Sequence, residues 1–397
     1  MKLSLKSSSI APSLTLSIDA KAKQMISEGL DVVGFGAGEP DFGTPKFILD
    51  AAKEAIDKGL TKYTPVSGTL QLKQAICRKF KQDNKLSYEP DQIIVSNGAK
   101  HSLYNIFQAI LNPGDEVLIP SPYWLSYPEM VQMADGVPVF IDSKECNEFR
   151  PTLEGIAKST TKQTKALIIN SPNNPTGSTY SEKELRQIAD IAVKNNLFVV
   201  SDEIYEELIY DGEIHHSIAS FDKDIYDKTI TVNGMSKSYA MTGWRIGYVA
   251  ARREIIDIMT NIQSHSTSNP NSIAQYAASA ALNGTKEEVH KMRGEFETRR
   301  DYMVERINKM PLVSCAIPKG AFYVMMNISL LFGKTINGKK ITGSLAFSEI
   351  LLDMAKVAVV PGIVFGAEGY VRLSYATSLN NIKKGLDKIL TFIEQLD

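Results

Sequence analysis

The chain has 397 residues, which exceeds the usual size of a single hydrophobic core, so we expect two domains. Its 44 basic and 45 acidic residues give a formal net charge of −1, which offers no electrostatic basis for binding nucleic acid or an anionic membrane. No apolar stretch approaches the roughly 18–20 residues that span a bilayer, and the first ten residues lack an apolar core of signal-peptide length. A cytoplasmic location is therefore expected.

Cysteine and histidine usage gives no sign of metal chemistry. The three cysteines are widely spaced and odd in number, which fits neither a disulfide framework nor a CxxC site. The five histidines are scattered, and His215 and His216 follow an Asp-Gly pair in a polar stretch. We expect this pair on a surface turn and expect no metal site.

In chain order, the polar segment Ser7–Ser17 is expected to form an extended arm. From about residue 90 to 250, short apolar runs alternate with helical patterns, which is typical of βαβ units and a mainly parallel sheet. The strands expected here are 92–95, 116–119, 165–169, 197–200, 229–232 and 246–249, and a helix is expected over Ala99–Leu111.

A second helix is marked by its own start and stop signals. Ser181 and Glu184 have capping-box spacing, and apolar residues at 185, 188, 189 and 192 recur at helical spacing. Asn195 and Asn196 end the pattern, and the next strand begins at once.

Polar residues follow several of the expected strands. Asp202 lies at the C-terminal end of the strand 197–200, while Asn97, Asn174 and Lys237 follow other strands. Ligands bind at this edge of open α/β sheets. The sequence therefore predicts that these four side chains gather at one rim.

The segment 236–248 is the most informative part of the chain. Lys237 follows one apolar run, and Arg245 lies eight positions on, just before the next run. A nucleophilic lysine needs a lowered pKa, and both a fixed cation such as Arg245 and partial desolvation would lower it. The planar guanidinium of Arg245 also suits a phosphate. From these residues alone, an ordinary loop lysine beside a structural arginine is the alternative interpretation.

After about residue 290 the pattern changes. Strand-like runs at 321–324 and 370–375 mix with helices, and the amphipathic stretch Ile382–Leu396 ends the pattern. We expect an α/β fold in which a large domain has a mainly parallel sheet flanked by helices, with a smaller α+β domain packed over its rim. The expected boundaries are 1–47 for the arm and first part of the small domain, 48–290 for the large domain and 291–397 for the small C-terminal domain.

Specific motifs carry a family resemblance across nearly the whole chain. They are Ala37-Gly38-Glu39-Pro40-Asp41-Phe42, Asn170-Ser171-Pro172-Asn173-Asn174-Pro175-Thr176-Gly177, Ser201-Asp202-Glu203-Ile204-Tyr205, Ser236-Lys237 and Tyr370-Val371-Arg372-Leu373-Ser374. By these motifs the chain resembles the class I aminotransferases of the pyridoxal phosphate (PLP) fold type I superfamily, and it is most similar to the bacterial aspartate aminotransferase branch. The resemblance implies PLP as cofactor and small-molecule amino acids and 2-oxo acids as substrates.

The resemblance also implies residue roles. Lys237 would carry PLP as a Schiff base and later move a proton, and Asp202 would keep the pyridine nitrogen protonated so that the ring accepts electrons. Tyr205 and Asn174 would hydrogen-bond the phenolic oxygen of the cofactor. Trp124 would stack on the ring, with a structural role as its alternative. Lys237, Asp202 and Tyr205 are the expected catalytic residues.

For the cofactor phosphate, the turn Gly98-Ala99-Lys100 opens a helix whose free N–H groups and dipole favour an anion. The family pattern adds Ser236, Arg245 and, from a neighbouring subunit, Tyr63. The resemblance therefore implies a homodimer with shared active sites.

For the substrate, the family pattern assigns Arg372 to the α-carboxylate, in a bidentate grip that lysine does not reproduce. The backbone of Gly38 would contact the same substrate, and so would Trp124 and Asn174. Lys100 matches the residue for a distal carboxylate, although a solvated lysine at a helix terminus is its alternative interpretation.

The leading expectation is ping-pong transfer of the amino group of L-aspartate to 2-oxoglutarate. The same chemistry on prephenate, aromatic amino acids or alanine is the nearest alternative, because Arg372 would serve all of these substrates. A PLP-dependent C–S lyase is a second alternative. A PLP-sensing transcription regulator is disfavoured because the family pattern begins by about residue 30, and an NAD-binding dehydrogenase because Gly34, Gly36 and Gly38 do not follow GxGxxG.

Overall fold

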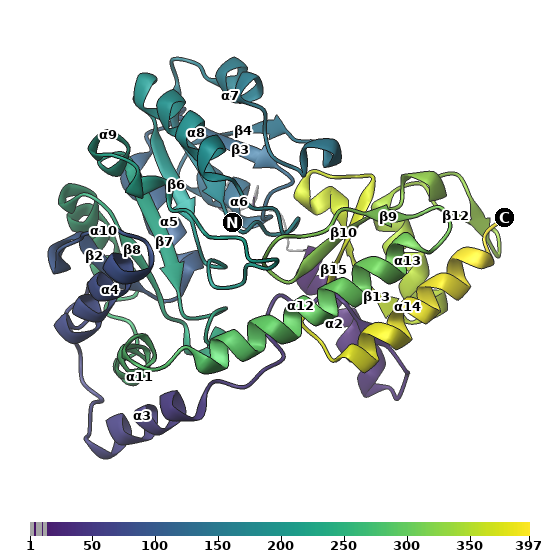
Figure 1. The fold of residues 1–397 in the computed structure, drawn as a ribbon, viewed down its shortest axis with the longest axis horizontal. Helices are drawn as coiled ribbons and strands as arrows, with labels where there is room; N and C mark the ends of the chain where they lie inside the picture. Colours follow the sequence, from purple (N-terminus) through teal and green to yellow (C-terminus); the bar gives the residue numbers. More distant parts are fainter. Residues whose placement is uncertain (1–3, 5–9, 11–13) are drawn as a thin grey trace.

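The computed structural model describes residues 4, 10 and 14–397. A larger part built on a seven-stranded sheet and a smaller part built on a four-stranded sheet lie next to each other, and the long helix α12 (Glu287–Asn308) runs between them (Figure 1). All seven strands of the larger sheet lie between residues 93 and 250.

The larger sheet has the strand order β2-β8-β7-β6-β5-β3-β4. Its strands are β2 (Ile93–Ser96), β3 (Glu116–Ser121), β4 (Val137–Asp142), β5 (Thr164–Asn170), β6 (Phe198–Asp202), β7 (Thr229–Gly234) and β8 (Gly247–Ala250). β8 runs antiparallel to both of its neighbours, β2 and β7, and all other pairs in this sheet are parallel. The predicted α/β fold with a mainly parallel sheet is confirmed, and each predicted strand overlaps an observed one.

Alternating side chains explain why helices cover both faces of this sheet. Ile168 and Val200 point to one face, and their sequence neighbours Leu167 and Val199 point to the other, as the period of two in a strand requires. The first face packs on α5 (Ala99–Ile110), α6 (Ser126–Met133) and α10 (Arg253–Ser266), and the second on α7 (Leu153–Ser159), α8 (Glu182–Lys194) and α9 (Lys223–Tyr226). The β2–β8 end of the sheet packs on α3 (Lys46–Asp57), α4 (Leu70–Asp83) and α11 (Ser272–Asn283).

The predicted capping box is present at the start of α8. The Ser181 hydroxyl accepts from the Glu184 backbone N–H at 3.3 Å, and the Glu184 carboxylate accepts from the Ser181 N–H at 2.9 Å. This cap fixes where the chain turns back toward β6, the strand that ends in Asp202.

The smaller sheet is antiparallel, in the order β14-β15-β10-β9. Its strands are β9 (Ser314–Cys315), β10 (Tyr323–Asn327), β14 (Val360–Pro361) and β15 (Tyr370–Ser374); the short pairs are β1 (Val33–Gly34) with β13 (Val357–Ala358) and β11 (Thr335–Ile336) with β12 (Lys339–Lys340). Apolar residues of α12, α13 (Ser344–Ala355) and α14 (Leu379–Glu394) form one core with β10 and β15. The domain boundaries at residues 47 and 290 stay a prediction.

The predicted extended arm over Ser7–Ser17 is wrong where the structure describes it. The helix α2 (Leu14–Ser27) already begins at Leu14, whereas residues 7–9 and 11–13 lie outside the described residues. Further along α2, Ala22 and Met25 are buried against Leu352 and Ala358, so tertiary packing supports a helix here. In the described part of the chain, no helix has both the length and the apolar character needed to cross a membrane.

Candidate active site

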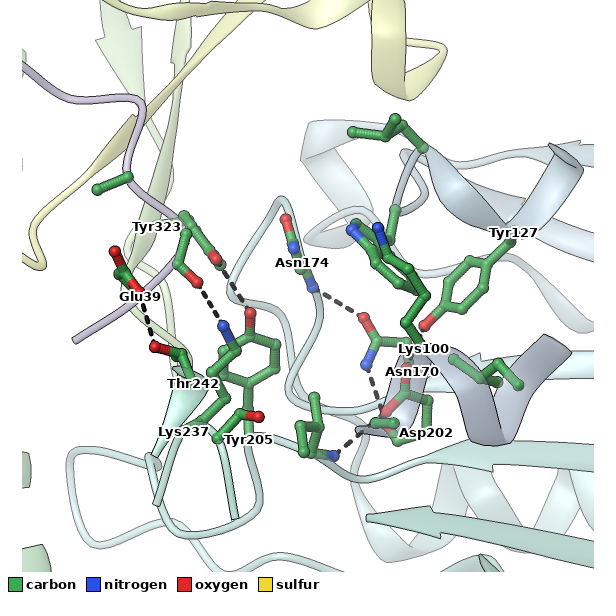
Figure 2. Close-up of a pocket in the computed structure, with 18 of the residues that line it drawn as sticks. Glu39, Lys100, Tyr127, Asn170, Asn174, Asp202, Tyr205, Lys237, Thr242 and Tyr323 are labelled. Carbon is green, nitrogen blue, oxygen red and sulfur yellow. Dashed lines mark hydrogen bonds between the residues drawn. The ribbon is translucent and has the colours of Figure 1, made fainter. Parts of the chain in front are cut away.

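A pocket of about 560 Å³ opens at the carboxyl ends of β5, β6 and β7 and extends to the smaller sheet (Figure 2). Most of the predicted site residues line it: Gly38, Ala99, Lys100, Trp124, Asn174, Asp202, Tyr205, Ser236, Lys237, Arg245 and Arg372. Gly98 and Tyr63 do not line it, although Gly98 lies against the side chain of Arg245, which does. Of the four side chains expected at one rim, those of Asn174, Asp202 and Lys237 line this pocket. Asn97 does not line it, although its backbone carbonyl accepts from Arg245 Nη2.

Lys237 follows β7 and keeps part of its surface open to the pocket. Its amine donates a hydrogen bond to the Gly38 carbonyl oxygen, and it lies 5.7 Å from the centre of the Tyr205 ring. Burial lowers the pKa of Lys237 to about 8; the Glu39 carboxylate opposes this shift, and the cations of Arg372 and Arg245 add to it. An appreciable fraction of this amine is thus neutral near pH 7, which is what a lysine nucleophile requires.

Asp202 ends β6 and is only 4% exposed. Its Oδ2 accepts a hydrogen bond from the Tyr127 hydroxyl at 2.6 Å, and its Oδ1 accepts from the Ile204 backbone N–H at 3.3 Å. Burial raises the pKa of Asp202 to about 6, although both hydrogen bonds act in the opposite direction. A buried carboxyl of this kind is a good partner for a cationic ligand group.

Asn170 and Asn174 connect Asp202 to the far side of the pocket. The Asn170 side chain donates to the Asp202 carbonyl at 3.0 Å and accepts from the Asn174 backbone N–H at 2.9 Å. The Asn174 side-chain oxygen in turn accepts from Arg372 Nη1 at 3.0 Å. A chain of hydrogen bonds through Asn170 and Asn174 therefore links the backbone of Asp202 to the guanidinium of Arg372.

Tyr205 and Tyr323 form a hydroxyl pair at 3.0 Å on the Lys237 side of the pocket (Figure 2). Both rings are buried, and burial raises the pKa of each hydroxyl above its ordinary value. Both hydroxyls are therefore neutral near pH 7 and each can donate a hydrogen bond.

Arg372 lies on β15 with 4% exposure, and its guanidinium stacks at 4.4 Å on the Tyr323 ring. Nη1 donates to Asn174 and Nη2 donates to the Gly36 carbonyl at 3.0 Å, while the buried Nε has no partner. Of the five N–H donors of a guanidinium, three are thus left for a ligand. Arg372 makes no ion pair with any carboxylate of the described residues, so a buried, unpaired cation lines the pocket and favours a carboxylate ligand.

A second cationic corner forms where α5 begins. Arg245 adopts a left-handed φ of 57° and donates from Nη1 to the Thr242 carbonyl at 2.9 Å and from Nη2 to the Asn97 carbonyl at 3.3 Å. A Cβ at Gly98, which has a φ of 87°, would lie 2.3 Å from Arg245 Nη2, and a Cβ at Gly247 would lie 2.2 Å from the Ala99 nitrogen. Glycine at 98 therefore lets the arginine approach the N-terminus of the helix, and glycine at 247 lets β8 pass close to the backbone of that N-terminus, a geometry that suits a phosphate.

Lys100 is the second residue of α5 and lines the pocket. Its ammonium lies 5.0 Å from the centre of the Trp124 ring. Burial, and then the charge of Arg245, lower the pKa of Lys100. Lys100 is nevertheless an exposed residue, so the choice between a site for a distal carboxylate and a solvated lysine at a helix terminus stays a prediction.

Three residues of the site were missed in the sequence. Tyr127 lies in the first turn of α6, three positions after Trp124, and the two rings meet edge to face with centres 5.3 Å apart. Asn170 stands inside a motif that was noted only for Asn174. Tyr323 carries no local signal, because only the packing of the two sheets brings it to Tyr205.

The expectation of a surface turn at His215 is wrong. Its side chain is only 10% exposed, and its Nε2 lies 3.0 Å from the Glu203 carboxylate. Neither Glu203 nor Glu206 lines the pocket. Glu203, Glu206 and His215 have the composition of a metal-binding cluster. However, the ammonium of Lys79 pairs with Glu206 there, so a cation of the protein itself already balances the charge.

The fold and the site match a known class of enzyme. The chain belongs to the aminotransferase class I and II family, whose family model matches residues 30–389. It is 50% identical to an aspartate aminotransferase of Bacillus sp. strain YM-2 over 97% of each chain, and 46% identical to a probable aspartate/prephenate aminotransferase of Aquifex aeolicus over 99% of each chain. The crystal structure of the aspartate aminotransferase from Rhizobium meliloti superposes with a TM-score of 0.97 at 41% identity, covering 100% of both chains.

Proposed function

We propose that this aminotransferase uses PLP to transfer the amino group of L-aspartate to 2-oxoglutarate. The observation that carries the proposal is that Lys237, Asp202 and Arg372 face one pocket: an amine with a lowered pKa, a buried carboxyl and a buried guanidinium without an ion-pair partner. The names of the relatives support aspartate as the amino donor.

The residues of the pocket fit PLP. Lys237 would hold the aldehyde carbon of the cofactor, and Asp202 would pair with the protonated pyridine nitrogen. Tyr205 and Asn174 would hydrogen-bond the phenolic oxygen, and Trp124 would stack on the ring. Gly98, Ala99, Ser236 and Arg245 would surround the phosphate, because the helix N-terminus and the guanidinium converge there.

When bound, PLP would supply an electron-withdrawing ring that accepts the electron pair of the substrate Cα–H bond. Asp202 would keep that ring cationic, and the 2.6 Å hydrogen bond from Tyr127 would hold the carboxylate in its charged form. When it is not bonded to the cofactor, Lys237 Nζ would accept the proton from the substrate Cα and donate it again to complete the amino transfer. This role is possible because part of this amine is neutral near pH 7.

Two cationic side chains would bind the two carboxylates of a dicarboxylic substrate. Arg372 would bind the α-carboxylate through donors that neither Asn174 nor Gly36 uses. Lys100 would attract the distal carboxylate, and Gly38, Trp124 and Asn174 would complete the wall around the substrate.

Tyr63 supports a homodimer with shared active sites. It is 91% exposed and does not line the pocket of its own chain. In a dimer its hydroxyl would reach the phosphate of the neighbouring subunit. A cytoplasmic location stays a prediction from the sequence.

A steady-state panel of amino donors tests the substrate. With 2-oxoglutarate as acceptor, aspartate should give the highest kcat/KM among aspartate, tyrosine, phenylalanine and alanine. A clear preference for tyrosine or alanine would overturn aspartate. Release of ammonia, pyruvate and a thiol from an amino acid with a thioether at Cβ, without an acceptor, would indicate a C–S lyase instead.

Prephenate is the second candidate substrate, because the similar protein of Aquifex aeolicus is named a probable aspartate/prephenate aminotransferase. Measuring transamination with prephenate in place of 2-oxoglutarate as the amino acceptor tests this second substrate. A kcat/KM for prephenate within tenfold of that for 2-oxoglutarate would make the enzyme bifunctional.

A further inference from the structure

The segment between β1 and α3 crosses the pocket beside both proposed reactive groups. Its Gly36 carbonyl accepts from Arg372, and its Gly38 carbonyl accepts from Lys237. In the part of the chain that the structure describes, residues 36–44 make no backbone–backbone hydrogen bond. The backbone of Phe35, just before the segment, is bonded to Ala358 and Ser374, so it is the part after Gly36 that relies on side-chain anchors.

One set of anchors ties the segment to the loop that carries Lys237. The Thr242 hydroxyl donates to the Glu39 carboxylate at 2.7 Å (Figure 2). The Thr44 hydroxyl donates to the Ala240 carbonyl at 2.8 Å and accepts from the Trp244 indole at 3.0 Å.

A second set ties the segment to helix α12. Arg299 Nη1 donates to Asp41 Oδ1 at 2.7 Å, and the same guanidinium lies 5.0 Å from the centre of the Phe42 ring. Phe42 meets Phe296 edge to face, with ring centres 5.3 Å apart and planes at 89°. Phe296 and Arg299 are three positions apart, so one face of α12 makes both contacts.

This second anchor is built more firmly than a surface ion pair. Arg299 is 8% exposed, and its flat guanidinium is stacked on two aromatic rings while it holds Asp41. Farther along the same helix, Met303 and Ile307 join the core that includes β15, the strand of Arg372. The Asp41–Arg299 pair therefore fixes the segment relative to the sheet that carries Arg372.

We propose that Asp41 and Arg299 are positioning residues that hold the Gly36 and Gly38 carbonyls in register with Arg372 and Lys237. This inference rests on the proposed aminotransferase function. Without the pair, the segment keeps its anchors on the Lys237 side and the Phe42–Phe296 contact but loses its charged tie to α12. The Gly36 carbonyl is then a less fixed acceptor for Nη2 of Arg372, and the guanidinium is aimed less accurately at a substrate carboxylate. Misplacement by about 1 Å is enough to cost a large factor in binding or rate.

The test uses the holoenzyme and the variants Arg299→Met and Asp41→Asn. Methionine keeps apolar contact with Phe42 and removes the charge, and asparagine keeps the size of the acid. Arg306→Met is the matched control, because Arg306 lies on the same helix and pairs with Asp387 at the surface, away from the segment. Four quantities are measured: the dissociation constant of maleate, an unreactive dicarboxylate; KM and kcat for aspartate; the dissociation constant of PLP; and the melting temperature.

Each test variant should weaken maleate binding and raise KM about tenfold, with kcat and PLP affinity within about threefold of the wild type. The double variant should bind maleate no more weakly than the weaker-binding of the two single variants, because both changes break the same contact. The control should leave all four quantities near wild-type values. Maleate binding equal to that of the control, or a loss of PLP affinity and melting temperature that accounts for the weaker binding, would overturn the proposal.

The wild-type enzyme separates this result from a failure of the proposed function. If it transaminates aspartate and the variants behave like the control, only the role of Asp41 and Arg299 is wrong. If the wild type does not transaminate but Arg299→Met still weakens maleate binding, the positioning role stands and the reaction must be revised.

Discussion

The Tyr127 hydroxyl donates a 2.6 Å hydrogen bond to the buried carboxylate of Asp202. Tyr127 comes from α6 and Asp202 from the end of β6, 75 positions apart in the chain. Because burial raises the pKa of Asp202, this bond is one of the contacts that keep the group charged near neutral pH.

Tyr127→Phe should therefore raise the pKa of Asp202 further. A hydrogen bond to a charged group contributes about 1.5–3 kcal/mol, which corresponds to about one to two pKa units. The acidic limb of the kcat/KM profile should move to higher pH by about one unit. Tyr123→Phe is the control, since Tyr123 is half-buried against Phe140 and makes no contact with Asp202; an acidic limb that moves equally in both variants would contradict the role of Tyr127.

Lys237→Met should stabilise the cofactor-free protein at pH 7. The folded-state pKa of Lys237 is lowered from 10.5 to about 8, so below pH 8 the folded protein holds a charged amine in an unfavourable environment. Between pH 8 and 10.5 the unfolded chain binds the extra proton, so stability rises with pH in this window and the cost of the lysine fades. The variant should gain about 1–2 kcal/mol at pH 7, after allowance for its contact with the pocket solvent, and less at pH 10.

Thermal denaturation of both proteins at the two pH values checks this prediction. The comparison between variants removes the contribution of other titrating groups. An equal difference in melting temperature at pH 7 and pH 10 would show that the pKa of Lys237 is not lowered.

Gly98→Ala should weaken PLP binding. A Cβ at this position would lie 2.3 Å from Arg245 Nη2, and the φ of 87° is unfavourable for alanine, so the arginine must leave the N-terminus of α5. We expect at least a tenfold rise in the dissociation constant of PLP, because a charged hydrogen-bonding partner of the phosphate is displaced. Gly294→Ala is the control, since a Cβ there meets nothing within 4 Å; unchanged PLP affinity in Gly98→Ala would exclude the proposed phosphate site.

Arg372→Lys should raise KM for every dicarboxylate far more than it weakens PLP binding. Lysine keeps the charge but has neither the planar fork nor the stacking on Tyr323 at 4.4 Å. Losing one arm of a bidentate contact costs about 1.5–3 kcal/mol, or roughly 10- to 150-fold in KM. Fluorescence titration with PLP provides the comparison, and an equal loss of cofactor affinity would move Arg372 out of the substrate site.

Much of this site followed from the sequence, for a physical reason. Parallel strands end at one edge, so polar residues after them converge there; this rule brought Asp202 and Lys237 together, and the family motifs gave them their roles. Tyr127 and Tyr323 did not follow, because their partners are set by packing between elements that are distant in the chain. His215 was placed wrongly because its polar neighbours are typical of a turn, whereas buried carboxylates on another segment draw it inward.

The central claim is that the Lys237 amine holds the cofactor. Sodium borohydride reduction of the PLP-loaded enzyme, followed by peptide mapping, tests it most directly, because reduction makes the link to the lysine permanent. The account predicts one labelled peptide, with the label on Lys237 and none on Lys100, the other lysine with a lowered pKa in the pocket. A label on Lys100 or any other residue, or no label in an enzyme that still transaminates, would contradict it.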